Sequence, residues 1–168
     1  MYQRILVPVD GSPTSNAGLA EAIKLAKLTG AQVYVLHVVD EMPLLMSGDG
    51  FAGMPGDVFA LLKEAGQTVL DQARRTVHAA GIPVEATLFD SLSGRLRDRV
   101  AEQVQAWGAD VIVLGTHGRR GVGRMLLGSD AEQIVRAATV PVLLVRGTPP
   151  EDDHTASMDS TQAKPEPE

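Results

Sequence analysis

Residues 110–132 read DVIVLGTHGRRGVGRMLLGSDAE, and this stretch is the most informative part of the chain. A short apolar run leads into a glycine-rich loop, and the loop leads into residues typical of a helix start. Glycine allows left-handed backbone conformations and close approach of a ligand to the main chain. Exposed N–H groups in such a loop, followed by a helix N-terminus, favour an anion. The stretch therefore predicts a strand, a phosphate-binding loop and a helix, with five glycines in the loop: Gly115, Gly118, Gly121, Gly123 and Gly128.

Strand-like and helix-like segments alternate on both sides of this loop. Short apolar runs predict strands over residues 2–9, 32–39, 83–89, 110–116 and 141–146. Helical periodicity or capping residues predict helices over residues 12–29, 57–81, 91–108 and 129–138. Such alternation predicts an α/β domain with a parallel sheet, helices on both faces and right-handed crossovers. The alternating segment 83–89 is expected at an edge of the sheet.

Polar residues before the helices predict how they begin. Ser12 is expected to cap the first helix, and Ser91 or Ser93 the third. Ser129, with Glu132 three residues later, has the spacing of a capping box. Ser129 therefore has two possible roles, as a helix cap and as a phosphate ligand.

The charge of the chain is concentrated at its C-terminal end. Residues 147–168 carry six carboxylates and one lysine, a net charge of −5 out of the −6 of the whole chain. A nearly neutral body argues against general nucleic-acid binding, which needs a basic face. We expect one domain over residues 1–146, followed by a disordered acidic and proline-rich tail over residues 147–168.

Several classes of site and location are disfavoured by composition. The chain has no cysteine, which excludes disulfides and thiolate sites. No apolar run approaches the ~18 residues of a membrane span, and the N-terminus reads as a strand rather than a signal peptide. We therefore expect a cytoplasmic protein without a membrane partner. The histidines are scattered, so a zinc site is not expected, and His37 is expected in the core.

The glycine loop matches neither of the two common phosphate-binding patterns. No Gly-Lys-Ser/Thr follows, as a Walker loop requires. A dinucleotide fingerprint from Gly121 and Gly123 would need glycine at position 126, where Leu126 stands. The spacing that remains is Gly115-x2-Gly118-x9-Gly128-Ser129.

Three features together resemble the universal stress protein family, over residues 1–146. They are the apolar start that ends in Asp10, the spacing Gly-x2-Gly-x9-Gly-Ser of the ATP-binding subgroup, and the apolar ending over residues 140–145. The resemblance implies a doubly wound, Rossmann-like sheet of five parallel strands in the order 3-2-1-4-5. In that order Asp10 and Gly115 end the two strands at the switch point, where ligands of open α/β sheets bind.

The resemblance also implies ATP, with Mg2+ held mainly by the phosphates. Asp10 would contact the ribose or the base, and the main chain at residues 38–39 would border the adenine. At least one of Arg119, Arg120 and Arg124 should reach phosphate. The full candidate set is Pro8, Val9, Asp10, Val38, Val39, Leu114, Gly115, Thr116, His117, Gly118, Arg119, Arg120, Gly121, Gly128, Ser129 and Asp130.

The leading functional hypothesis is a nucleotide-dependent stress-response module that acts through protein partners. A weak ATPase or nucleotidyl-transfer enzyme is the alternative, although no residue is assigned to catalysis. A nucleotide-independent adaptor is the third hypothesis. Residues 40–56 either cover the site, contact a partner or pack over neighbouring helices. The last strand would be an exposed apolar edge, so we predict a homodimer through Val140, Pro141, Val142, Leu143, Leu144 and Val145.

Overall fold

The computed structural model describes residues 1–39, 57–90, 94–116 and 127–147. Five strands alternate with helices along the chain, as the periodicity predicts. The strands are β1 (Arg4–Pro8), β2 (Gln32–Val39), β3 (Val84–Asp90), β4 (Val111–Gly115) and β5 (Val142–Val145). The helices are α1 (Pro13–Thr29), α3 (Asp57–Ala79), α4 (Leu96–Gln103), the π-helical turn η2 (Val104–Gly108) and α5 (Ser129–Ala137). The predicted tail and the 40–56 segment lie outside the described residues, apart from Gly147.

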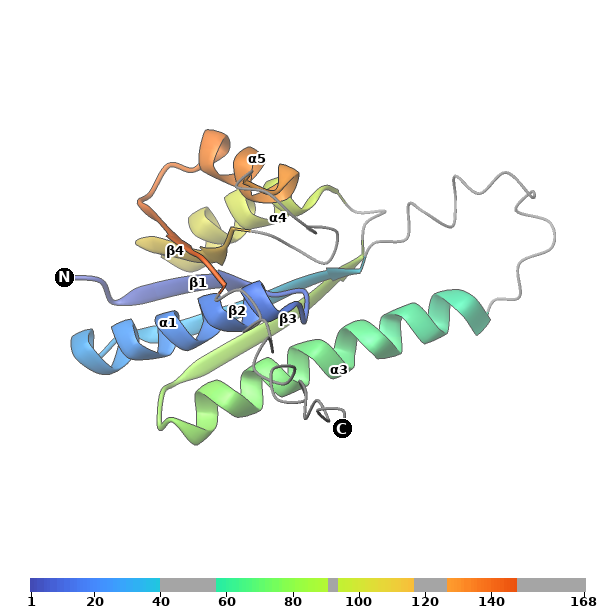
Figure 1. Ribbon diagram of the computed structural model, residues 1–168, viewed down its shortest axis with the longest axis horizontal. Coiled ribbons are helices and arrows are strands. Elements are labelled where there is room, and N and C mark those ends of the chain that lie inside the picture. Colours follow the sequence, from blue (N-terminus) through green and yellow to red (C-terminus); the bar gives the residue numbers. More distant parts are fainter. Residues whose placement is uncertain (40–56, 91–93, 117–126, 148–168) are drawn as a thin grey trace, which may run out of the picture.

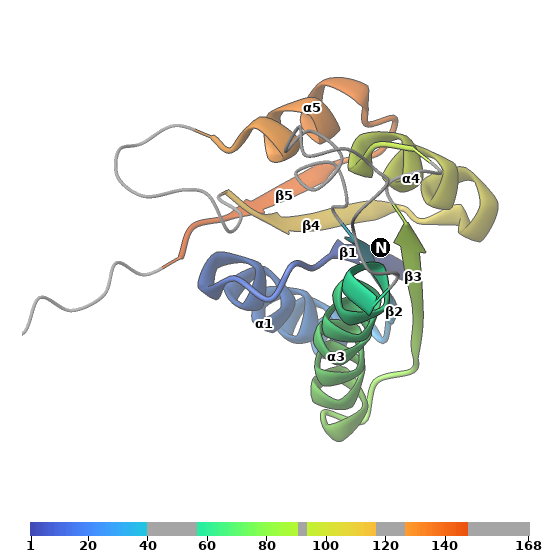
Figure 2. The ribbon, with the colours of Figure 1, turned by 90° about the vertical axis from the view of Figure 1, so that its right-hand side faces the viewer.

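The five strands form one parallel sheet in the order β3-β2-β1-β4-β5. This confirms the predicted order and places β3 at an edge. Helices α1 and α3 cover one face of the sheet, and α4 and α5 cover the other (Figures 1 and 2). The winding reverses between β1 and β4, which pair through Ile5 with Val111 and Leu6 with Ile112.

Alternate residues of each central strand feed two separate cores. Ile5 and Val7 of β1 pack with the α1 and α3 side chains, whereas Leu6 packs with those of α4 and α5. All three side chains are fully buried. Each face of a parallel sheet is covered by helices, so both sets of side chains must be apolar. This explains the nearly continuous apolar runs in the sequence.

Helix α1 begins and ends as predicted. Ser12 is its N-cap, and the Ser12 hydroxyl accepts a hydrogen bond of 3.2 Å from the N–H of Ser15. Gly30 ends the helix with φ +74°, and its N–H donates to the Ala26 carbonyl. The left-handed conformation explains why glycine stands there.

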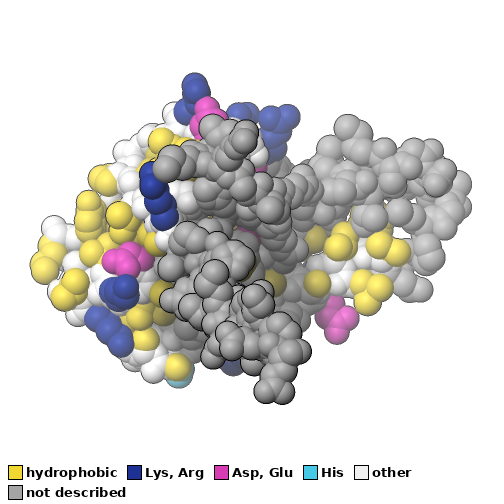
Figure 3. Space-filling view, viewed as in Figure 1, with side chains coloured by type: hydrophobic (Ala, Val, Ile, Leu, Met, Phe, Trp, Pro, Cys, Tyr) yellow, Lys and Arg dark blue, Asp and Glu magenta, His cyan; other side chains and the backbone are white. Residues whose placement is uncertain are grey.

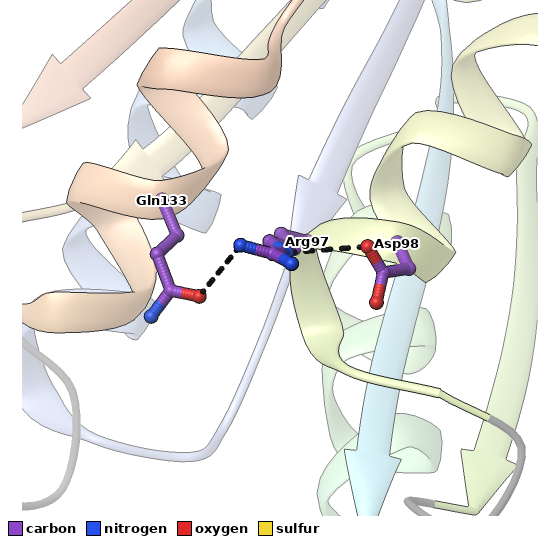
Figure 4. Close-up of polar contacts among 3 residues, drawn as sticks. All are labelled: Arg97, Asp98 and Gln133. Carbon is purple, nitrogen blue, oxygen red and sulfur yellow. Dashed lines mark hydrogen bonds and ion pairs between the residues drawn. The ribbon is translucent and has the colours of Figure 1, made fainter.

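The start of α4 differs from the prediction. The N-cap is Arg95, without a side-chain capping bond, and the helix begins at Leu96. Neither Ser91 nor Ser93, which lie outside the described residues, is the cap. A cap must directly precede the first helical residue, and both serines come too early in the chain. Helix α4 contacts α5 through Arg97. The guanidinium of Arg97 lies between Asp98, its neighbour in α4, and Gln133 of α5 (Figure 4).

The amino-terminal ends of the strands are joined by polar contacts around β1. Asp110 accepts hydrogen bonds from the N–H groups of Gln3, at 2.8 Å, and Arg4, at 3.2 Å. The side chain of Arg4 donates to the carbonyl of Trp107 at 2.8 Å, and the indole of Trp107 donates to Glu85 at 2.8 Å. These contacts hold the end of the sheet opposite to the candidate site.

Helix α3 is the longest helix in the described part of the chain, and only part of it packs on the sheet. Between residues 58 and 79 its first buried position is Gly66, while Leu61 is 62% exposed. Hydrophobic side chains gather over the N-terminal turns of α3, at the right of the space-filling view (Figure 3).

Among the described residues, no helix has the length and apolar character needed to cross a membrane.

Candidate functional site

The candidate site lies at the carboxyl ends of β1 and β4. These strands are neighbours in the sheet, but their connections run to opposite sides, to β2 and to β5. Loops on the two sides therefore diverge, which is why ligands of open α/β sheets bind at such a position. The chain after β1 supplies Asp10, and the chain after β4 supplies the glycine motif.

Asp10 is held in a tight turn between β1 and α1. Its Oδ1 accepts a 2.9 Å hydrogen bond from the N–H of Ser12, and its own N–H donates to Ser15 Oγ at 3.1 Å. Gly11, between Asp10 and Ser12, has φ +78°, a conformation that other residues rarely adopt. The carboxylate of Asp10 is half-buried. Local hydrogen bonds therefore fix its position before any ligand arrives.

The end of β2 forms the adjoining wall. Val39 is 5% exposed and Val38 is half-buried. The N–H of Val9 donates to the Leu36 carbonyl at 2.8 Å, so β1 stays attached to β2 beyond Pro8. The main chain at Val9 and at residues 38–39 is thus brought to the same edge as Asp10.

Gly115 has a packing role that is independent of any ligand. A Cβ added there would lie 2.4 Å from the Thr14 carbonyl oxygen and 3.0 Å from the Ser15 nitrogen. On the other side of the same contact, a Cβ added to Gly18 would lie 3.0 Å from the Gly115 nitrogen. The two glycines let α1 approach β4 closely. This places the hydroxyl-rich start of α1 against the start of the loop.

The two ends of the glycine loop are joined by a backbone hydrogen bond. The N–H of Thr116 donates to the Val145 carbonyl at 2.9 Å, and the Thr116 carbonyl accepts from the N–H of Gly128 at 2.7 Å. Gly115 and Gly128, distant in the motif, are therefore neighbours in space. The N–H of Gly128 faces Thr116, so it is already used within the protein.

The predicted capping box at Ser129 is wrong. Ser129 is the first residue of α5, the N-cap is Gly128, and no side chain caps the helix. A capping box requires the serine to precede the helix, where its hydroxyl can reach the N–H three residues on. Glu132 instead forms an ion pair of 2.8 Å with Arg136. The hydroxyl of Ser129 is thus not used as a cap, which leaves the ligand role open.

The start of α5 combines opposite electrostatic influences. The helix dipole and the N–H groups of the first turn favour an anion. Asp130 and Glu132 lie in that same turn, and their carboxylates oppose one. A polyphosphate at this position would therefore need cations to balance the charge. Among the described residues, no three histidine, aspartate or glutamate side chains are grouped as metal ligands.

Part of the predicted site lies outside the described residues. This applies to His117, Gly118, Arg119, Arg120, Gly121 and Arg124, so their predicted roles stay predictions. The remaining members of the set lie at or next to the carboxyl ends of β1, β2 and β4, which share one edge of the parallel sheet, and at the start of α5.

Two contributors to the site were not predicted. Gly18 packs against Gly115, a contact between distant segments that one sequence does not reveal. His37 is buried, as expected of a core residue, at 6% exposure. Its Nδ1 also lies 2.6 Å from the Val9 carbonyl oxygen, next to Asp10.

Comparison with known proteins agrees with this architecture. The pattern of the Universal stress protein family matches residues 1–146. Universal stress protein MJ0531 of Methanocaldococcus jannaschii is 34% identical over 151 residues, covering 87% of this chain and 83% of that protein. The solved structure of MJ0577, from the same organism, superposes with a TM-score of 0.74 at 26% identity, over 89% of this chain and 99% of the other.

Two more distant universal stress proteins were solved with bound nucleotides. One is a complex with cAMP, at 22% identity, and the other, from Archaeoglobus fulgidus, is a complex with dAMP, at 24% identity. Both superpose with a TM-score of 0.61, over 88% and 86% of this chain and 98% of theirs. At such identities the likeness concerns the fold alone. The family pattern and the relative at 34% identity each span most of this chain, which therefore belongs to the universal stress protein family.

Proposed function

We propose that this protein binds ATP at the switch point between β1 and β4 and, in that state, acts on protein partners. One observation carries the proposal: the Asp10 turn and both ends of the glycine motif lie at the same edge of the sheet. Asp10 would bind the ribose, and residues 38–39 would border the adenine. The phosphates would extend toward Thr116 and the start of α5.

Bound phosphates would need cations beside them, because two carboxylates lie near their proposed position. Asp10 and Asp130 are carboxylates, so they disfavour a polyphosphate beside them unless cations intervene. Mg2+ carried by the phosphates supplies one such cation, and the arginines of the glycine loop supply others. The protein's own contribution at the described positions is the N-terminus of α5 and the hydroxyl of Ser129. Nucleotide complexes of relatives with this fold are compatible with the proposal.

The binding test is a calorimetric titration of the purified protein with Mg2+ and ATP. Gly128→Val is the better loop variant, because Gly128 has φ −57° and ψ 146°, angles that any residue adopts. Gly115→Val would disturb the packing of α1 as well. We expect wild-type protein to bind and Gly128→Val to lose most of its affinity without unfolding. Absence of binding by wild-type protein, with and without Mg2+, would refute the proposal.

The edge strand β5 supports the further proposal of a homodimer. It pairs with β4 on one side only in the described sheet, and its Leu143 and Leu144 are each 39% exposed. Exposed apolar edges favour pairing with another chain. Sedimentation analysis of Leu144→Lys against wild-type protein tests this contact. A wild-type monomer at working concentration, or an unchanged dimer in the variant, would contradict it.

A further inference from the structure

His37 is a buried titratable side chain that the proposed site does not use directly. We propose that His37 is a positioning residue, which holds the peptide between Val9 and Asp10 in the orientation needed for nucleotide binding. The inference rests on the proposed function. His37 lies in β2, whereas the proposed ligand contact that it supports, Asp10, follows the neighbouring strand β1.

The hydrogen bond fixes which ring nitrogen carries the proton. The Nδ1 of His37 lies 2.6 Å from the Val9 carbonyl oxygen. A carbonyl oxygen can only accept, so Nδ1 must be the donor. His37 is 6% exposed, and loss of the donor would leave the Val9 carbonyl without this hydrogen bond in a buried place.

The peptide between Val9 and Asp10 is held from both sides. Its carbonyl accepts from His37, and its N–H, that of Asp10, donates to Ser15 Oγ at 3.1 Å. A peptide unit is planar, so two bonds on opposite edges fix its rotation. The N–H of Ser12, two residues after Asp10, donates to the Asp10 carboxylate at 2.9 Å. Because the Asp10 side chain is attached directly after the Val9–Asp10 peptide, the direction of its carboxylate depends on how this peptide is oriented.

Helix α3 holds the ring itself in place. A Cβ added to Gly66 would lie 3.0 Å from Cδ2 and 3.2 Å from Nε2 of His37, and 2.9 Å from a methyl group of Val39. Glycine at this position lets α3 pack directly on the ring. The imidazole is thus fixed between α3 and the exit of β1, as a support for the turn rather than as a ligand.

Two substitutions separate this role from general core packing. His37→Leu removes the donor, whereas His37→Asn keeps an N–H donor at the position of Nδ1. Val35→Ala is the matched control, because Val35 is fully buried on the same strand, two residues earlier and on the same face. Its cavity should lower the melting temperature without reaching the turn.

The experiment measures ATP affinity in the presence of Mg2+ by calorimetry, and melting temperature, for all four proteins. We expect about tenfold weaker binding for His37→Leu, and a Kd within about threefold of wild type for His37→Asn. Val35→Ala should melt earlier yet bind as wild type does. Wild-type affinity in His37→Leu, or an equal loss of affinity in Val35→Ala, would overturn the inference.

An NMR readout distinguishes failure of this inference from failure of the proposed function. The amide signals of Asp10 and Ser12 should shift more in His37→Leu than in Val35→Ala, with no nucleotide present. If wild-type protein binds no nucleotide, the proposed function fails and takes the binding role of His37 with it. If wild-type protein binds but these amides do not move in His37→Leu, only the positioning role fails.

Discussion

Replacing Gly115 by alanine tests the close packing on which the site is built. The added Cβ would lie 2.4 Å from the carbonyl oxygen and 2.6 Å from the carbonyl carbon of Thr14. Both atoms belong to the main chain, so no rotamer change relieves the clash. Because Cβ contacts below 3.0 Å are essentially never observed, α1 or β4 must move by at least about 0.6 Å.

The cost follows from that movement. Overpacking that shifts backbone costs ~1–3 kcal/mol, and a clash with main chain on a central strand belongs in the upper part of that range. We therefore expect Gly115→Ala to lower the free energy of unfolding by about 2–3 kcal/mol. For a domain of this size, that loss corresponds to a melting temperature lower by about 4–12 °C.

Urea unfolding and calorimetry of Gly115→Ala and Gly30→Ala provide the measurement. Gly30 is the matched control, because its φ is +74° and nothing lies within 4 Å of an added Cβ. Gly30→Ala should lower the free energy of unfolding by only about 1 kcal/mol, because alanine is strained in a left-handed conformation but meets no clash there. A Gly115→Ala protein as stable as Gly30→Ala would refute the packing argument.

Three other substitutions test contacts elsewhere in the fold by urea unfolding. Ser12→Ala should lower the free energy of unfolding by about 1 kcal/mol, because the α1 cap is lost; unchanged stability would show that the cap is not needed. Tyr34→Phe removes a 2.6 Å hydrogen bond to Thr87 and should cost ~0.5–1.5 kcal/mol; a neutral effect would contradict that contact. Glu132→Gln breaks an exposed ion pair on α5 and should change stability by at most about 0.5 kcal/mol. A larger effect would mean that the pair is not a simple surface contact.

Apolar periodicity and capping residues predicted the strands and the α-helices of this fold, but not the π-helical turn η2 at the end of α4. Residues such as Leu6 and Val7 are apolar on both sides of β1 because helices cover both faces of the sheet. The strand order came from the family resemblance, since alternation alone does not order the strands. Strand boundaries moved by at most two residues, whereas α4 begins at Leu96, five residues after the start of the predicted range 91–108.

Local patterns failed where a distant contact decides the outcome. Ser129 and Glu132 have the spacing of a capping box, but the spacing does not say which residue is the last outside the helix. Gly128 holds that place, with its N–H bonded to Thr116. The bond of His37 to Val9 depends on the register of β1 against β2, and the Gly18–Gly115 contact on the packing of α1. Neither is encoded in local sequence.

The most direct test of ATP binding at the β1–β4 switch point is amide chemical-shift mapping. Isotope-labelled protein would be titrated with ATP in the presence of Mg2+. We expect saturable shifts confined to the candidate edge, at Val9, Asp10, Val38, Val39, Thr116 and Ser129. Absence of saturable shifts, or shifts centred on the opposite end of the sheet around Trp107 and Asp110, would contradict the proposed site.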